Sequence, residues 1–327
     1  MKKLLFIVLL SHSLSANSQV MRKRVTKLMG GRFDITIVAN DSLSAEHYID
    51  TVISEISRIE NQISDWKADT QISEVNRNAG VAPVKVTPEV FALVERAIHL
   101  SEITNGAFDV SFAAMDKIWK FDGSMTKMPA PDAVKKSVEK VGYRKILLNA
   151  KSHTIFLKQK GMKIGFGALG EGYATDKCRD MMMAKGIKAG IVNGSGDMST
   201  WGKQPDGSNW KVGITNPMHE DTIFAVIPLK QSAVVTSGSY QKFILFNGKR
   251  YSHIINPATG YPATGLCSVT VFGPSAETAN GLSTSIMVLG KDNGIKLLKK
   301  YPAYSCIMIN DDGRIFTKNI NIKKYKL

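Results

Sequence analysis

The stretch Gly165-Phe166-Gly167-Ala168-Leu169-Gly170-Glu171-Gly172-Tyr173-Ala174-Thr175-Asp176 places four glycines within eight residues. The apolar run Met162–Ile164 before it predicts a strand, and the periodic segment Tyr173–Met183 after it predicts a helix. Glycines let a backbone approach a ligand closely, and the first turn of a helix offers free N–H groups and a positive dipole end. The stretch is therefore typical of an anion site, most naturally for phosphate. A tight strand-to-helix turn without a ligand explains the same glycines equally well.

The first 18 residues have the order of a secretory signal peptide. Met1-Lys2-Lys3 is followed by an apolar run from Leu4 to Leu10 and then by small polar residues up to Ser18. The apolar run is too short to span a bilayer. We therefore expect residues 1–18 to be removed on export, leaving residues 19–327 as a single domain with room for two lobes. The alternative is an uncleaved anchor.

The composition limits the classes of partner. The chain has 327 residues, a formal net charge of +15 and 43% hydrophobic residues. A basic chain can bind nucleic acid, an anionic membrane or a polyphosphate. However, the basic residues are scattered, no nucleic-acid-binding module is recognisable, and an exported protein does not meet genomic DNA. We expect a soluble protein with no nucleic-acid partner and at most a peripheral association with membranes.

The three cysteines do not indicate a covalent or metal framework. Cys178, Cys267 and Cys306 are odd in number and widely spaced, which matches neither a disulfide scaffold nor a zinc site. Cys267 and Cys306 lie in apolar runs and are expected in the core.

Helices are expected in clusters and strands in hairpins, which predicts an α+β fold rather than a doubly wound parallel sheet. Thr87-Pro88 has the pattern of a helix start, and Asn247-Gly248 is a strong hairpin turn. The remaining expected helices are 42–64, 132–141, 277–288 and 291–300. The expected strands are 28–39, 145–149, 154–158, 189–193, 210–215, 224–229, 233–236, 243–246, 249–255, 267–272, 305–309 and 315–318.

Three more stretches carry polar groups that suit a ligand site. They are Ser237-Gly238-Ser239-Tyr240, the turn from Ser252 to Gly260, and the helix start Ala279–Thr284. Asn280 and Thr284 are four residues apart, so their oxygens share one helix face and suit a hard cation. An Asn and a Thr at this spacing also serve commonly as capping or solvated residues. His253 alone fits a structural role as well as a catalytic one, and no G-x-S-x-G elbow of a hydrolase is present.

Taken together, these stretches resemble the ApbE family, the FAD:protein FMN transferases, from about Lys27 to Asn319. The residues that carry the resemblance are Met29-Gly30, the Trp66 loop, Thr104-Asn105-Gly106-Ala107-Phe108-Asp109, Gly167 to Asp176, Asn193-Gly194-Ser195-Gly196-Asp197, Thr236 to Tyr240, His253 to Gly260 and Ala279 to Thr284.

The resemblance implies a T-fold-like α+β domain that binds FAD in an elongated cleft. With Mg²⁺, it implies transfer of FMN to a Thr or Ser hydroxyl of an acceptor protein, in an Asp-Gly-x-Thr/Ser type of motif, with release of AMP. It also implies a periplasmic location or the outer face of the inner membrane, where the acceptor is a redox-complex subunit. The implied flavin contacts are Met29, Trp66, Ala107, Phe108, Asp109, Glu171 and Ile255. The implied metal contacts are the Ala168 carbonyl, Asn280, Ser283 and Thr284.

Two roles for His253 follow from that resemblance: it takes the proton of the attacking hydroxyl, or it binds phosphate. Three positions depart from the family pattern, which has Asp more often at Gly165, Asn256 and Asn280. Loss of the carboxylate at Asn280 is expected to weaken Mg²⁺ binding. Two alternatives to transfer therefore stay open: an FAD-binding protein with little transferase activity, and a Mg²⁺-dependent FAD pyrophosphatase.

Overall fold

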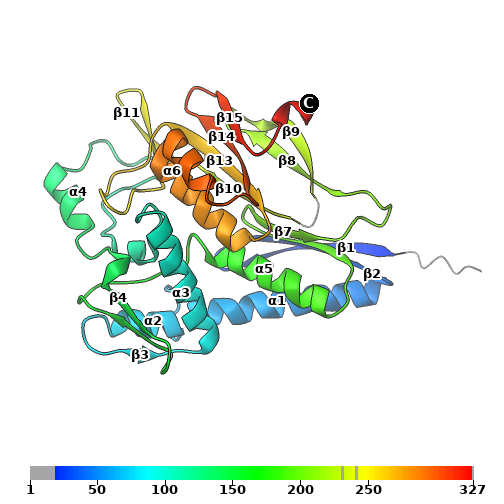
Figure 1. Cartoon of the computed structure of the whole chain (residues 1–327), viewed down its shortest axis with the longest axis horizontal. Coiled ribbons are helices and arrows are strands. Elements are labelled where there is room, and N and C mark those ends of the chain that lie inside the picture. Colours follow the sequence, from blue (N-terminus) through cyan, green and yellow to red (C-terminus); the bar gives the residue numbers. More distant parts are fainter. Residues whose placement is uncertain (1–18, 230–231, 240–241, 326–327) are drawn as a thin grey trace, which may run out of the picture.

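An antiparallel sheet of eight strands forms the centre of the molecule (Figure 1). It belongs to a computed structural model that describes residues 19–229, 232–239 and 242–325, so the expected signal peptide lies outside the described residues. In spatial order the strands are β1 (Val20–Leu28), β2 (Gly31–Ala39), β6 (Ala189–Gly194), β7 (Asp197–Trp201), β10 (Ala233–Gly238), β13 (Leu266–Gly273), β14 (Ser305–Asn310) and β15 (Ile315–Lys318).

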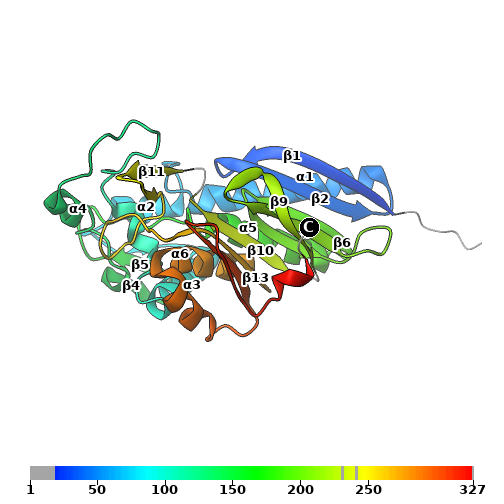
Figure 2. The ribbon, with the colours of Figure 1, turned by 90° about the horizontal axis from the view of Figure 1, so that it is seen from above.

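Three helices cover one face of this sheet. They are α1 (Ser42–Ile63), α5 (Gly170–Ala184) and α6 (Ala276–Leu298) (Figures 1 and 2). The helix α1 forms because apolar residues recur every three or four positions, and that stripe is buried. Its buried side chains include Ile49, Val52, Ile56 and Ile59, which pack against β2 and α5 side chains in one core cluster.

A two-stranded ribbon, β8 (Trp210–Asn216) and β9 (His219–Leu229), covers the opposite face. Trp210 and Ile214 of the ribbon pack with Val38, Val234 and Phe272 of the large sheet. These sheet residues alternate with those that face the helices, as the two-residue period of a strand requires. The sheet is therefore buried on both sides.

The remaining elements form one end of the molecule, on the left in Figure 1. They are α2 (Gln71–Arg77), β3 (Val84–Lys85), α3 (Pro88–Ile103), η1 (Val110–Ala114), α4 (Pro131–Ser137), η2 (Tyr143–Lys145), β4 (Ile146–Asn149), β5 (Thr154–Leu157), β11 (Phe243–Phe246) and β12 (Lys249–Ser252); a last turn, η3 (Ile322–Lys324), lies near the C-terminus. A small apolar cluster around Trp119, Val134 and Ile244 holds α4 against the β11–β12 hairpin.

The expected α+β class and most expected elements are confirmed. The run Met162–Ile164 is not a strand, however. The side-chain amide of Asn76 accepts from the Ile164 N–H at 2.8 Å and donates to the Ile164 carbonyl at 2.9 Å. One amide thus satisfies both backbone groups that a neighbouring strand would otherwise pair.

Other boundaries also differ from the expected ones. The helix expected from Tyr173 begins at Gly170, inside the glycine stretch, and the helix expected over 132–141 ends at Ser137. The helices expected at 277–288 and 291–300 are one helix, α6, bent at Gly290, where φ is 75°. Strand β1 was not expected, since its exposed face is Lys- and Arg-rich.

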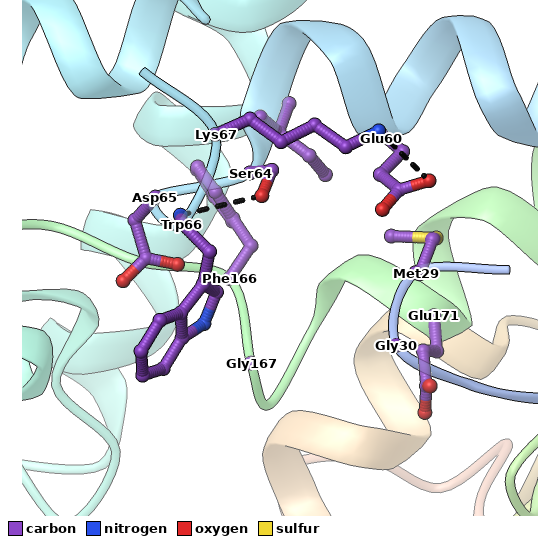
Figure 3. Close-up of a pocket in the computed structure, with 11 residues that line it drawn as sticks. Met29, Gly30, Glu60, Ser64, Asp65, Trp66, Lys67, Phe166, Gly167 and Glu171 are labelled. Atoms are coloured by element: carbon purple, nitrogen blue, oxygen red, sulfur yellow. Dashed lines mark hydrogen bonds and ion pairs between the residues drawn. The ribbon is translucent and has the colours of Figure 1, made fainter.

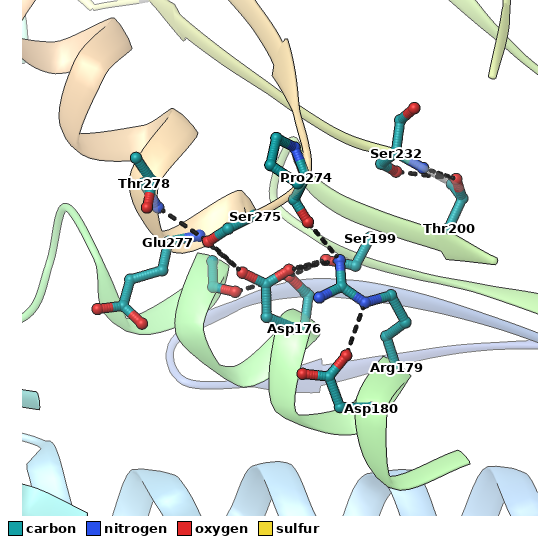
Figure 4. A network of polar contacts seen from close by, with 12 residues as sticks. Asp176, Arg179, Asp180, Ser199, Thr200, Ser232, Pro274, Ser275, Glu277 and Thr278 are labelled. Carbon is teal, nitrogen blue, oxygen red and sulfur yellow. Dashed lines mark hydrogen bonds and ion pairs between the residues drawn. The ribbon is translucent and has the colours of Figure 1, made fainter. Parts of the chain in front are cut away.

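A buried carboxylate, Asp176 on α5, fixes the start of α6 (Figure 4). It accepts hydrogen bonds from Ser275 Oγ at 2.8 Å, from the Glu277 N–H at 3.1 Å and from Ser199 Oγ at 2.7 Å. Arg179 balances its charge at 3.0 Å. This network joins α5, α6 and β7 and so positions the residues described next. In the described part of the chain, no helix is both long and apolar enough to cross a membrane.

Candidate functional site

The four glycines of the central stretch have different roles. A Cβ atom on Gly172 would lie 2.7 Å from the Ala276 carbonyl oxygen, so Gly172 is needed where α5 meets the first turn of α6. A Cβ atom on Gly170 would lie 3.2 Å from Met29 Cε. By contrast, a Cβ atom on Gly167 meets nothing within 4 Å, and Gly167 borders a pocket. Packing therefore explains part of the glycine pattern, and an open loop explains the rest.

The pocket lies beside that loop and has a volume of about 400 Å³. Figure 3 shows Asp65 and Trp66 on one side, Met29, Gly30 and Glu171 on the other, and Gly167 between them. The other lining residues are Glu60, Ile63, Ser64, Lys67 and Phe166.

Trp66 presents its ring to the solvent at the pocket. Its side chain is 78% exposed, so it does not cap the core as residues in polar loops commonly do. The ammonium of Lys117 lies 4.3 Å from the ring centroid, a cation–π distance. An exposed indole of this kind can stack on a flat ring system.

Backbone geometry brings Met29 and Glu171 to the other side of the pocket. Met29 and Gly30 form the turn between β1 and β2, with φ of 51° and 79°. Gly31 follows, and a Cβ atom there would lie 2.6 Å from Glu171 Oε1 and 2.1 Å from Ser195 Oγ. Glycine at this position thus leaves the space that the ends of these two side chains occupy. Burial raises the pKa of Glu171, while a hydrogen bond from Ser195 opposes that shift.

The hydroxyl and amide oxygens expected to bind a metal do gather at one place. Asn280 Oδ1 and Thr284 Oγ1 are 3.4 Å apart on one face of α6. Ser283 Oγ is buried and lies 2.7 Å from Ser237 Oγ on β10. Oxygen-only groups of this kind suit Mg²⁺ rather than softer metals. The Ala168 carbonyl belongs to the open loop at 167–169, next to the start of α5.

A carboxylate completes the oxygen cluster, although the sequence assigned it no role. Asn280 Nδ2 donates to Asp197 Oδ2 at 2.6 Å, and the Gly172 N–H donates to the same carboxylate. Burial, together with the nearby Glu171 carboxylate, raises the pKa of Asp197 to about 8, although the two hydrogen bonds oppose the shift. We call Asp197, Ser237, Asn280, Ser283 and Thr284 the oxygen cluster.

Three of the expected flavin contacts are buried and are not among the residues that line the pocket. Ala107, Phe108 and Asp109 expose less than a tenth of their surface, and Phe108 belongs to the main core cluster. Asp109 accepts from Ser111 N–H and from Tyr143 N–H, at 2.8 and 3.0 Å. In this structure its carboxylate orders the loop between α3 and η2. Their contact with a flavin stays a prediction.

His253 lies just beyond β12 and is not among the residues that line the pocket. Its Nδ1 is 3.1 Å from the Lys242 carbonyl oxygen, so the neutral ring carries its proton on Nδ1 and its free lone pair on Nε2. The residue is exposed to solvent, yet its ring packs edge-on to Phe121, and partial desolvation lowers its pKa. Ile255, two residues further along the chain, packs against the small apolar cluster around Trp119 and forms an isolated β-bridge with Pro262.

The structure adds charged residues that sequence patterns did not single out. Asp65 lies beside Gly165, where a Cβ atom would be 3.2 Å from its Oδ2. A carboxylate from another loop thus lies next to the position that lacks the family's usual Asp. Burial raises the pKa of Asp65, and the charges of Lys163 and Lys117 oppose this shift. Glu60 and Lys67 form an ion pair of 3.3 Å at the pocket edge. Asp65 and Lys67 belong to the Trp66 loop, but the sequence patterns assigned no role to them or to Glu60.

Comparison with known proteins agrees with this arrangement. The ApbE family model matches residues 29–308. An FAD:protein FMN transferase from Treponema pallidum is 32% identical over 282 residues, covering 82% of this chain and 78% of the relative. A protein of the same name from Haemophilus influenzae is 27% identical and covers 90% and 88%.

Solved structures share the fold. The crystal structure of the ApbE protein from Thermotoga maritima superposes with a TM-score of 0.83 at 25% identity, covering 94% of this chain and all of that one. The flavin transferase ApbE from Vibrio cholerae has a TM-score of 0.82 at 24% identity and covers 94% and 99%. With the family model matching most of its length, the chain belongs to the ApbE family and is an enzyme of the transferase class.

Proposed function

We propose that this protein transfers FMN from FAD to a Thr or Ser hydroxyl of an acceptor protein, depends on Mg²⁺ and releases AMP. One observation carries the proposal: the pocket and the oxygen cluster are adjacent. Glu171 lines the pocket, and its charge acts on Asp197 in the oxygen cluster. FAD needs such an arrangement, because its ring systems and its pyrophosphate require different surroundings.

In this proposal the aromatic side of the pocket holds a ring system of FAD. Trp66 offers an exposed ring for stacking, and Met29 forms part of the opposite wall. Gly167 leaves the loop open, so its backbone can approach the pyrophosphate. The N-terminal end of α5 adds a favourable dipole for an anion.

The charges around the site favour a metal ion. Glu171 and Asp197 both present carboxylates where the pyrophosphate would come close, and like charges at short range repel. Asn280 and Thr284, together with the Ala168 carbonyl, would hold Mg²⁺, with Asp197 beside them. The bound ion would neutralise the pyrophosphate and the leaving AMP.

His253 is proposed to accept the proton of the attacking hydroxyl. Its lowered pKa keeps the ring neutral near pH 7, and Nε2 carries the free lone pair. The hydroxyl oxygen attacks the phosphorus of the FMN half, and the bond to the bridging oxygen breaks. AMP leaves with the electron pair of that bond. Atoms balance: FAD and the acceptor hydroxyl give the FMN ester, AMP and one proton.

The cellular setting is also a proposal. Residues 1–18 have the pattern of an export signal, which supports a periplasmic location or the outer face of the inner membrane. An acceptor at that location would be a redox-complex subunit that carries the Thr or Ser.

The test is a product assay with residues 19–327, FAD, Mg²⁺ and a peptide bearing the Asp-Gly-x-Thr acceptor motif. We expect acid-stable flavin fluorescence on the peptide and one AMP for each flavin bound. Free FMN with AMP, formed whether or not the peptide is present, would instead identify a pyrophosphatase. Bound FAD that stays intact would contradict both activities.

A further inference from the structure

Asp197 is a buried carboxylate without a cationic partner. It is the first residue of β7 and is 5% exposed. Among the described residues, no ion pair involves it, whereas the equally buried Asp176 on the same side of the sheet is paired with Arg179 at 3.0 Å. Buried charges in proteins are normally paired or coordinate a metal. A cation bound beside Asp197 would supply the missing counter-charge, which a proton supplies when no cation is bound.

Asp197 also determines which way the Asn280 amide faces. Nδ2 of Asn280 donates to Asp197 at 2.6 Å, which turns Oδ1 toward Thr284 Oγ1 at 3.4 Å. When it is ionised, as beside a bound cation, this carboxylate accepts hydrogen bonds and donates none, so the amide nitrogen is the atom that faces it. Without Asp197, nothing at this contact distinguishes the two ends of the amide.

The carboxylate itself is held by the glycine stretch. The Gly172 N–H, in the first turn of α5, donates to Asp197. A Cβ atom on the same Gly172 would lie 2.7 Å from the Ala276 carbonyl oxygen, so glycine is what lets α5 pack this closely against the first turn of α6. Asp197 thus links the loop of the pocket to the helix that bears Asn280 and Thr284.

We propose that Asp197 is the positioning residue of the cation site: it orients Asn280 Oδ1 toward the ion and supplies the negative charge that the neutral side chains lack. The inference rests on the proposed function for the presence of a cation at the oxygen cluster. Asp197 and Asn280 act as one unit, in which a carboxylate on one side compensates for an amide on the other.

The test measures Mn²⁺ binding to the FAD-free protein by electron paramagnetic resonance and calorimetry. Asp197→Asn removes the charge but keeps the shape, and we expect it to weaken Mn²⁺ binding about 10- to 100-fold, as loss of an orienting partner does at metal sites. The exchange variant Asp197→Asn/Asn280→Asp restores one carboxylate and one amide. We expect its affinity to return to within about threefold of the wild type, because the charge and the hydrogen bond are both regained.

Glu55→Gln is the control. It removes a largely buried carboxylate that pairs with Arg58 on α1, outside the pocket and the oxygen cluster, so we expect a lower melting temperature but an unchanged Mn²⁺ affinity. A purely structural role for Asp197 predicts the same result for Asp197→Asn, and that result would overturn the inference. Failure of the exchange variant to regain affinity while it melts like the wild type would overturn it as well, as would a wild-type protein that binds no Mn²⁺.

The outcome is separate from that of the transfer assay. Mn²⁺ binding that follows this pattern supports the role of Asp197 even when no FMN reaches a peptide. In that case only the proposed function fails.

Discussion

The substitution Asn280→Asp gives the sharpest test of the oxygen cluster. Asn280 Nδ2 lies 2.6 Å from Asp197 Oδ2, so an aspartate there would bring two carboxylates together in a buried place. Two unit charges about 4 Å apart would repel by about 4 kcal/mol at an effective dielectric of about 20, which is the upper bound on the effect, because the pKa of Asp197 is already about 8 and the metal-free pair shares one proton. The metal-free variant also loses the hydrogen bond from the Asn280 amide, worth about 0.5–1.5 kcal/mol.

The two effects predict opposite changes with and without metal. In the metal-free protein we expect Asn280→Asp to lower the melting temperature by several degrees. With Mg²⁺ or Mn²⁺ present, the two negative charges instead increase the affinity for the metal, because two carboxylates share a divalent ion that one carboxylate held before. We expect the metal affinity to increase at least about 10-fold, equivalent to about 1.4 kcal/mol.

The assay combines Mn²⁺ titration with thermal melts at zero and saturating metal. Asn280→Ala is the control, since it removes the oxygen as well as the hydrogen bond and should weaken metal binding. An unchanged Mn²⁺ affinity in Asn280→Asp, together with an unchanged metal-induced rise in melting temperature, would refute the assignment of Asn280 as a ligand.

Three further predictions concern the pocket, the base and the glycine loop. Trp66→Ala should leave the melting temperature unchanged and weaken FAD binding about 10-fold, since stacking on an aromatic ring contributes about 1–3 kcal/mol. Titration followed by flavin fluorescence measures the FAD affinity. Leu43 is also exposed, and Leu43→Ala is the control that must not change the FAD affinity. His253→Gln should lower kcat about 10²- to 10⁴-fold without changing FAD affinity. Because the base must be neutral and its pKa lies below the ordinary 6.5, wild-type kcat/KM should rise with pH through a value below 6.5 and stay level above pH 7; a pH-independent rate would contradict this role. Gly172→Ala should destabilise the fold by about 1–3 kcal/mol, since the new Cβ meets the Ala276 backbone, whereas Gly167→Ala should keep its stability and bind FAD more weakly; equal denaturant midpoints for the two variants would argue against these roles.

Local patterns predicted most elements because their causes are local. The apolar stripe of α1, the Thr87 cap of α3 and the Asn247-Gly248 turn each depend on residues close together in the chain. The strand expected at Met162–Ile164 failed because its partner is the side chain of Asn76, 88 positions away. Such a contact has no periodic signal.

The candidate site likewise has features that local sequence predicts and features that only the fold reveals. The face shared by Asn280 and Thr284 follows from helical spacing alone, and the structure shows it. The links from Asp197 to Asn280 and from Asp65 to Gly165 join segments 83 and 100 positions apart, so only the fold reveals them. Each places a carboxylate next to a position where the resemblance implied an Asp that this chain lacks.

Ala107, Phe108 and Asp109 illustrate a further limit. The motif that contains them fits the family, yet here their side chains pack in the core or order a loop. Their packing accounts for their burial, and their contact with a flavin stays a prediction.

Mass spectrometry of the acceptor tests the central claim most directly. Two peptides, with Thr or with Ala at the acceptor position, are incubated with residues 19–327, FAD and either Mg²⁺ or a chelator. We predict that only the Thr peptide with Mg²⁺ gains the mass of FMN less one water, and that fragmentation places the addition on the threonine. An unmodified Thr peptide beside intact FAD, or beside free FMN and AMP, would contradict FMN transfer by this protein.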